Sequence, residues 1–166
     1  MIPLLSGFMK LLKMPLTNET ILQILHNMAL TDNFTLLELM DTRVPDGVRD
    51  NLSSINLEQF GNLMELSAFL QYVRSAFQVP IKINSAFRSK MVNEHVGGVP
   101  TSNHLKGLAA DIAYTWPSAT HDAILDFFHK CLVSGVLTEV ITYKTFVHIA
   151  IHPDHVQDKK YYPLPF

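Results

Sequence analysis

The chain has 166 residues, of which 48% are hydrophobic and 17% charged, and its formal net charge is −2. This length suits one domain, and the composition is typical of a chain that buries a sizeable core. The slightly negative charge excludes the broad basic surface of a nucleic-acid-binding protein. The single cysteine, Cys131, excludes an internal disulfide and is predicted to be a buried helix residue.

The N-terminal residues are apolar without forming a recognisable targeting segment. Lys10 and Lys13 lie inside the apolar residues 1–16 and not before them, and no cleavage site of small residues is clear. The segment is too short to span a bilayer. We interpret residues 1–27 as an N-terminal appendage, as a short membrane-surface helix, or as sequence upstream of an internal start at Met28.

Apolar residues recur at helical spacing in two segments of the first half of the chain. Residues 17–28 form one of these segments, and residues 56–77 form the strongest helical pattern. Between them, residues 34–40 predict a short strand or a helical turn. The polar residues 42–54 contain proline, glycine and asparagine, and they predict a loop.

Strand patterns dominate the second half of the chain. The expected elements are a strand at 81–85, a loop-rich segment over 88–103, a strand at 109–114, a helix at 118–134 and a β-hairpin over 138–151. Ser118 can cap the helix and Gly135 can end it. We expect a domain over residues 28–152 and an extended tail over 153–166. The order of elements indicates an α+β fold, in which an antiparallel sheet packs against the two long helices.

Two segments, residues 102–111 and 146–149, offer two imidazoles and one carboxylate that could converge on one metal ion. A strand that begins after the loop holding His104 would bring Asp111 beside that ring, and His148 lies in the middle of the second strand. A lone histidine in a strand is usually a hydrogen-bonded structural residue. Zinc accepts this mixture of nitrogen and oxygen ligands, and a catalytic zinc keeps three protein ligands and an open position. The pattern therefore indicates a zinc site on the sheet.

The same residues are similar to the motifs of a known family. Residues 102–111 match every fixed position of the pattern S-x-H-x-x-G-x-A-x-D, and residues 146–149 match its later strand histidine. Residues 83–89 are similar to an upstream S-G-Y-R-S segment, with alanine and phenylalanine replacing glycine and tyrosine. From about residue 33 to residue 151, the chain resembles the zinc D-Ala-D-Ala carboxypeptidase and dipeptidase family of cell-wall peptidases. That family includes phage endolysins that cleave the L-alanyl-D-glutamate bond, and the chain is most similar to its small phage and bacterial members.

The resemblance implies roles for four residues of the site. It implies that zinc is bound by His104, Asp111 and His148, and that Arg88 faces the substrate. A planar guanidinium can hold a substrate carboxylate or stabilise an oxyanion, although an arginine that braces a loop is the alternative. Ser102 either donates a hydrogen bond to the substrate or caps its loop.

One position departs from the family pattern. Active members commonly place Glu or Asp three residues before the last histidine, as the general base, and here that position is Thr145, whose hydroxyl is too weak a base. A hairpin that turns through Tyr143 and Lys144 would place Glu139 directly opposite His148. Glu139 is then either the base or a carboxylate that accepts a proton from the imidazole. A shifted turn would leave it on the solvated surface.

These features together predict a zinc metallopeptidase that hydrolyses a D-Ala-D-Ala or L-Ala-D-Glu bond in peptidoglycan stem peptides, as a carboxypeptidase or an endopeptidase. Glu139 and Arg88 are the predicted catalytic residues, and Arg88 and Ser102 the predicted substrate contacts. We expect a monomer with a peptidoglycan peptide as partner, without nucleic acid or a stable membrane span. It would be cytoplasmic, or released or virion-associated if phage-encoded. The alternative, which Thr145 favours, is a non-catalytic member that binds cell-wall peptides or belongs to a virion.

Overall fold

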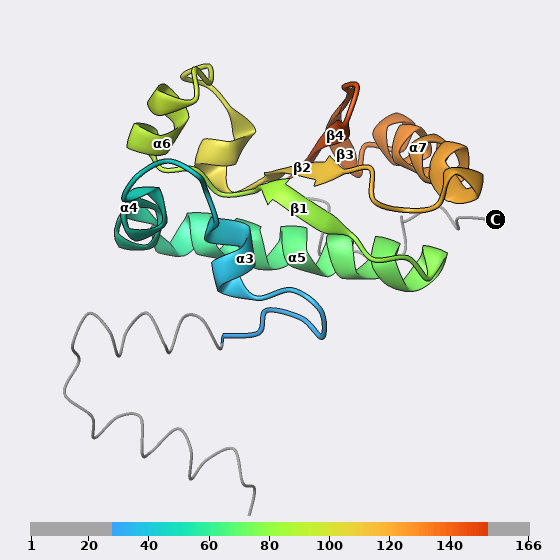
Figure 1. Ribbon diagram of the computed structural model, residues 1–166, viewed down its shortest axis with the longest axis horizontal. Coiled ribbons are helices and arrows are strands. Elements are labelled where there is room, and N and C mark those ends of the chain that lie inside the picture. The colour runs from blue at the N-terminus through green and yellow to red at the C-terminus, as the bar shows by residue number, and fades with distance from the viewer. Residues whose placement is uncertain (1–27, 153–166) are drawn as a thin grey trace, which may run out of the picture.

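The structure is a computed structural model that describes residues 28–152 (Figure 1). The expected N-terminal appendage, almost all of the helix predicted over 17–28 and the C-terminal tail lie outside the described residues. Within the described part, strands form one antiparallel sheet in the order β1-β2-β4-β3. Their bounds are β1 Lys82–Ser85, β2 Ala109–Ala113, β3 Leu137–Thr142 and β4 Phe146–Ile151.

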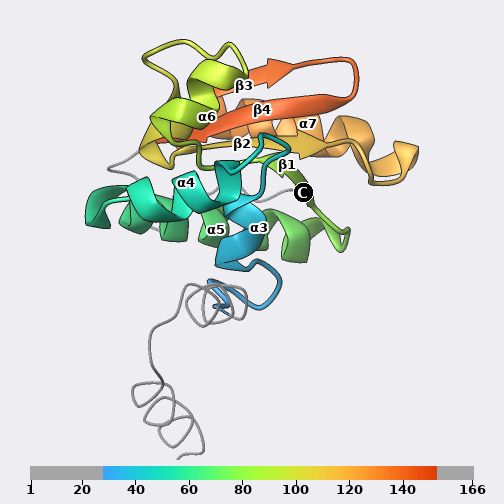
Figure 2. The same ribbon diagram turned by 60° about the vertical axis from the view of Figure 1, so that its left-hand side comes forward.

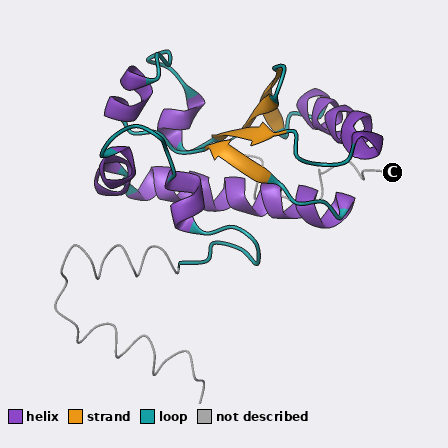
Figure 3. Ribbon diagram, viewed as in Figure 1, coloured by secondary structure: helices purple, strands orange, loops and turns teal. Residues whose placement is uncertain are grey.

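Helices accompany the sheet on both sides (Figure 3). They are α3 Leu36–Met40, α4 Gly47–Ser54, α5 Leu57–Phe77, α6 Lys90–His95, the short 3-10 helix η1 Asn103–Lys106, and α7 Ser118–Val133. None of the helices in residues 28–152 has the length and apolarity to cross a membrane. The prediction of an α+β fold with an antiparallel sheet and packed helices is confirmed.

The two faces of the sheet have different surroundings. Helix α5 runs along the sheet beneath β1 and β2 in Figure 1, and Figure 2 shows α7 behind the strands and α6 in front of them. Alternate residues of the central strands, Ile112, Val147 and Ile149, join the buried core with side chains of α5 and α7. Because side chains alternate along a strand, the intervening Asp111 and His148 point to the other face.

Local sequence explains the long helix α5. Asn56 and Gln59 form a capping box, in which the Asn56 side chain accepts from the Gln59 N–H at 2.9 Å and the Gln59 side chain accepts from the Asn56 N–H at 2.8 Å. One face of the helix is buried through Leu63, Leu66, Phe69, Leu70 and Val73. The prediction of this helix is confirmed, as are the strands at 81–85 and 109–114 and the helix at 118–134.

Cys131 lies buried on α7, as predicted. Burial raises the pKa of its thiol to about 12, so the side chain packs as an apolar group and is not a nucleophile near neutral pH. Ser118 is the first residue of α7 and not its cap, which is Pro117. Gly135 follows the helix with a φ of 80°, a conformation that glycine adopts at low cost.

The loop predicted over residues 42–54 is wrong for its second part, which is helix α4. One polar residue of this segment, Asn51, is fully buried. Its amide nitrogen donates to the carbonyls of Met40, at 2.9 Å, and Phe87, at 3.2 Å. Its amide oxygen accepts from the Ser89 N–H at 2.7 Å. Tertiary hydrogen bonds to a polar side chain thus stabilise a helix that apolar periodicity does not reveal.

The segment expected to be loop-rich over residues 88–103 contains helix α6 and the start of η1. Ser89 begins α6 by accepting from the Val92 N–H, and the Asn93 side chain donates to the Val99 carbonyl at 3.0 Å. Ser89 and Asn93 are both buried. The residues at 34–40, expected as a strand or a helical turn, contain the helix α3.

Candidate metal centre and adjoining cleft

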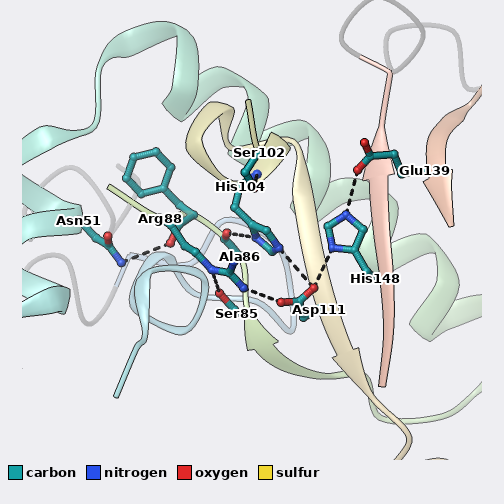
Figure 4. A network of polar contacts seen from close by, with 10 residues as sticks. Asn51, Ser85, Ala86, Arg88, Ser102, His104, Asp111, Glu139 and His148 are labelled. Carbon is teal, nitrogen blue, oxygen red and sulfur yellow. Dashed lines mark hydrogen bonds and ion pairs between the residues drawn. The ribbon is translucent and has the colours of Figure 1, made fainter. Parts of the chain in front are cut away.

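Three possible ligand side chains converge on the face of the sheet opposite the core (Figure 4). Asp111 and His148 are direct partners on β2 and β4, and His104 comes from η1. One ligand atom from each of the three side chains lies within 4.8 Å of the other two. The cluster joins a residue of the short helix η1 to two strand residues that are 37 positions apart in the sequence.

Close packing against α5 fixes the short helix that carries His104. The Ser102 side chain accepts from the His104 N–H at 3.3 Å and caps η1. Gly107 ends η1 with a φ of 73°, and a Cβ atom there would lie 2.6 Å from the Gln59 carbonyl oxygen. The glycine of the metal motif therefore has a structural reason, since a side chain at this position would push η1 away from α5.

The His104 ring has a defined tautomer. Its Nδ1 lies 2.6 Å from the Ala86 carbonyl, which can only accept, so Nδ1 carries the proton. Burial lowers the pKa of His104, so the ring is neutral and Nε2 presents a lone pair. This lone pair faces the Asp111 carboxylate at 3.3 Å. His104 Nε2 and Asp111 Oδ1 are thus two buried acceptors that face each other, and a cation bound between them would satisfy both.

Asp111 is the centre of the cluster. Its Oδ1 contacts both rings, and its Oδ2 accepts from Arg88 at 2.6 Å. Burial opposes ionisation, but the hydrogen bond from His148 and the Arg88 charge hold the pKa of Asp111 well below its usual range, whereas the Nε2 of a neutral His104 has no proton to donate. Arg88 also donates from Nε to the Ser85 hydroxyl at 2.8 Å. Asp111 is therefore a carboxylate at neutral pH, and Arg88 is held firmly beside it.

The His148 ring is held at both nitrogens. Nδ1 lies 2.8 Å from Asp111 Oδ1, and Nε2 lies 3.0 Å from Glu139 Oε2. Burial lowers the pKa of His148, but the two carboxylates outweigh it and raise the pKa above the ordinary value. If Nε2 carries the ring proton and donates it in the hydrogen bond to Glu139, Nδ1 has a lone pair that can bind a cation on the Asp111 side. The donor atoms that fit a metal ion are thus His104 Nε2, Asp111 Oδ1 and His148 Nδ1.

The register of the hairpin differs from the prediction. Glu139 pairs with Ala150, and His148 with Ile141, so the predicted direct pairing of Glu139 with His148 is wrong. The chain turns at Lys144 and Thr145, one residue later than expected, which shifts the pairing by two positions. A shift of two keeps Glu139 on the same sheet face as His148, now as a diagonal neighbour. The long carboxylate side chain reaches the ring from there.

A cavity of about 560 Å³ adjoins the cluster on the side of Asp111. Its polar lining includes Arg43, Ser85, Arg88, His95, Asp111 and Thr145. We refer to this cavity as the cleft. Arg43 and His95 line the cleft but were not predicted as site residues. Both lie in segments predicted to be loops, where no sequence pattern distinguishes a polar residue of a site from a solvated one.

Glu139 lines a different cavity, of about 500 Å³, which is bounded by the start of α5, η1 and the ends of β3 and β4. Burial opposes its ionisation, but hydrogen bonds from His148 and Asn103 hold the pKa of Glu139 below its ordinary value. Thr145 lies exposed in the hairpin turn, and its carbonyl accepts from the Tyr114 N–H at 3.1 Å. A carboxylate therefore supports His148 from one side, and a threonine lies on the side of the cleft.

The domain combines a sheet-borne cluster of two histidines and one aspartate with an adjacent cleft. Three protein ligands leave one coordination position of a zinc ion open, which is the arrangement of a catalytic metal centre. A family model described as Peptidase M15 matches residues 32–150, and the chain belongs to this family. The family resemblance seen in the sequence is thereby confirmed, and the chain is a peptidase by family, hence a hydrolase. A comparison with curated proteins finds no match.

Proposed function

We propose that the chain is a zinc-dependent peptidase that hydrolyses a peptide bond in peptidoglycan stem peptides. The observation that carries the proposal is the orientation of the His104 ring, in which Nδ1 contacts the Ala86 carbonyl and Nε2 faces the Asp111 carboxylate, while His148 presents a second nitrogen to the same oxygen. Zinc would be held by these three residues. When bound, it supplies a Lewis acid that polarises a carbonyl group and lowers the pKa of water.

Arg88 is the proposed substrate-orienting residue. Ser85 and Asp111 each engage one of its nitrogens, which fixes the guanidinium plane at the wall of the cleft. The remaining N–H donors are suited to a substrate carbonyl or carboxylate. Donors that are already fixed in place stabilise developing negative charge without the cost of reorganisation.

Glu139 is the proposed positioning residue for His148. It contacts Nε2, on the side of the imidazole away from Asp111, and it lines the second cavity and not the cleft. Accepting the Nε2 proton orients the ring and leaves Nδ1 unprotonated. The lowered pKa of Glu139, which follows from its hydrogen bonds to His148 and Asn103, makes it a weaker base, so the geometry favours this role over that of general base.

Metal analysis of the purified full-length chain beside Asp111→Ala tests the proposal. We expect about one zinc per chain in the wild type and almost none in the variant. Asp126→Ala is the matched control, because within the described residues that exposed carboxylate forms an ion pair only with Lys130, on the surface of α7. Failure of the wild type to bind zinc added at neutral pH would overturn the proposal.

Thr145 favours a second candidate function, a non-catalytic member that binds cell-wall peptides. Among the described residues that line the cleft there is no glutamate, and the one aspartate, Asp111, belongs to the cluster of possible metal ligands. Incubation of the zinc-loaded chain with peptidoglycan fragments separates the two functions. Released peptides support the peptidase, and their new termini distinguish a carboxypeptidase from an endopeptidase. Retention of fragments without cleavage supports the binding protein.

A further inference from the structure

The cleft beside the cluster has an unequal balance of charge. Its described lining contains two arginines but only one acidic residue, Asp111. Asp111 is already paired with Arg88 at 2.6 Å. The whole chain carries a net charge of −2, so the excess of cationic groups is particular to the cleft and does not reflect a generally basic protein.

Arg43 is the cationic group that this pairing leaves over. It is exposed, and it lies between Asp41 and Asp46, yet none of the ion pairs found among the described residues includes it. Neither aspartate belongs to the cleft lining. The Arg43 guanidinium therefore retains its donors for a ligand that enters the cleft.

Packing against α4 holds the backbone at Arg43 in place. The Thr42 hydroxyl accepts from the Val44 N–H at 3.3 Å, and the Val44 carbonyl accepts from the Gly47 N–H at 2.9 Å. A Cβ atom at Gly47 would lie 2.5 Å from Thr42 and 3.0 Å from Val44, so this loop packs closely on the helix. A cation on an anchored loop binds an anion with less loss of conformational freedom than one on a mobile loop.

We infer that Arg43 forms a subsite for a substrate carboxylate, separate from the Arg88 contact, and that the enzyme acts on anionic peptides. This inference rests on the proposed peptidase function. Guanidinium groups bind carboxylates through paired, charge-assisted hydrogen bonds, and two arginines on one cleft can hold two points of a peptide. The carboxylate is either that of an acidic residue within the peptide or that of the peptide C-terminus.

Four labelled peptides distinguish these sources and test the subsite. They share one sequence of alanine, D-glutamate and a diamino acid, with the free D-glutamate carboxyl and the C-terminal carboxyl each present as acid or amide. Equilibrium binding to the zinc-loaded full-length chain is measured by fluorescence anisotropy, and kcat/KM is measured for each peptide. We expect the wild type to bind one acid form about two- to fivefold more tightly than its amide.

Three variants assign that preference. Arg43→Gln should bring the acid-to-amide ratio close to one, and Arg43→Lys should retain part of it. Arg49→Gln is the matched control, because Arg49 is an exposed arginine on α4 that does not line the cleft, and its ratio should equal that of the wild type. If the acid form binds more tightly only where the D-glutamate carboxyl is varied, that carboxylate occupies the subsite. If it does so only where the C-terminal carboxyl is varied, the C-terminus occupies it.

The outcomes separate this inference from the proposed function. A wild-type ratio of one, an unchanged ratio in Arg43→Gln, or no binding of any peptide would overturn the subsite. Hydrolysis with no dependence on Arg43 would leave the peptidase standing without it. A preference in binding that depends on Arg43, with no hydrolysis of any peptide, would sink the peptidase and retain the subsite.

Discussion

His104 and His148 belong to the same cluster of possible metal ligands, but their electrostatic surroundings are opposite. His104 is buried on η1 and donates to a backbone carbonyl, and burial lowers its pKa. His148 is half-buried on β4 between two carboxylates, which outweigh burial and raise its pKa. The neutral His104 ring presents a lone pair to a cation at neutral pH, whereas the His148 ring holds its proton more strongly than an ordinary imidazole. A metal ion would therefore meet one fixed ligand and one that protons compete for.

The largest expected effect comes from removing the fixed ligand. His104→Ala should reduce zinc affinity by more than the roughly 10–100-fold typical of a residue that only supports a ligand. The measurement is zinc affinity by competition with a chelator at constant pH. His129→Ala is the matched control, since that exposed histidine on α7 contacts only the Leu125 carbonyl among the hydrogen bonds of the described residues. Wild-type affinity in His104→Ala would exclude this histidine from the ligand set.

Glu139→Gln tests how far the second histidine depends on its carboxylate. A neutral amide still accepts a hydrogen bond from Nε2 but attracts the imidazole proton less, so we expect roughly a tenfold loss of zinc affinity at neutral pH. The kcat of zinc-saturated enzyme should change little if Glu139 acts only by positioning. A large loss of kcat at full zinc occupancy would instead identify Glu139 as the base.

Proton competition sharpens the comparison of the two rings. Because the carboxylates raise the pKa of His148, this ring keeps its proton to a higher pH than an ordinary imidazole, whose pKa is about 6.5. Zinc affinity should therefore fall by roughly tenfold per pH unit as the pH drops below the pKa of His148. Glu139→Gln removes one of the two causes, so the fall should begin at a lower pH. Titrations of zinc binding between about pH 5 and 8 would reveal the difference.

Sequence patterns predicted the parts of the fold that depend on local chemistry. The strands, α5 and α7 follow apolar periodicity and capping residues. Helix α4 could not be predicted in this way, because it depends on Asn51, whose partners Met40, Phe87 and Ser89 become neighbours only in the folded chain. The proximity of Glu139 to His148 required a register that depends on where the hairpin turns, and the sequence does not fix that position to one residue.

The site was predictable where a motif specifies it and not elsewhere. The candidate ligands follow from motif spacing, and their convergence follows from adjacent strands β2 and β4. Arg43 reaches the cleft from a loop that precedes β1 by almost 40 residues, so no local pattern connects it with Asp111. Long-range placement of this kind depends on the packing of α3 and α4 against the rest of the domain.

The smallest expected effect concerns Ser102, which holds the fixed histidine and caps η1. If capping is its role, Ser102→Ala should cost about 1 kcal/mol of unfolding free energy, and Ser102→Gly only a few tenths, because glycine tolerates a cap position. Urea denaturation of the zinc-free chain measures both. If Ser102 instead donates to the substrate, the two substitutions should raise KM equally. A difference between alanine and glycine in stability, with KM unchanged in both, therefore identifies the cap and leaves substrate contacts to the arginines.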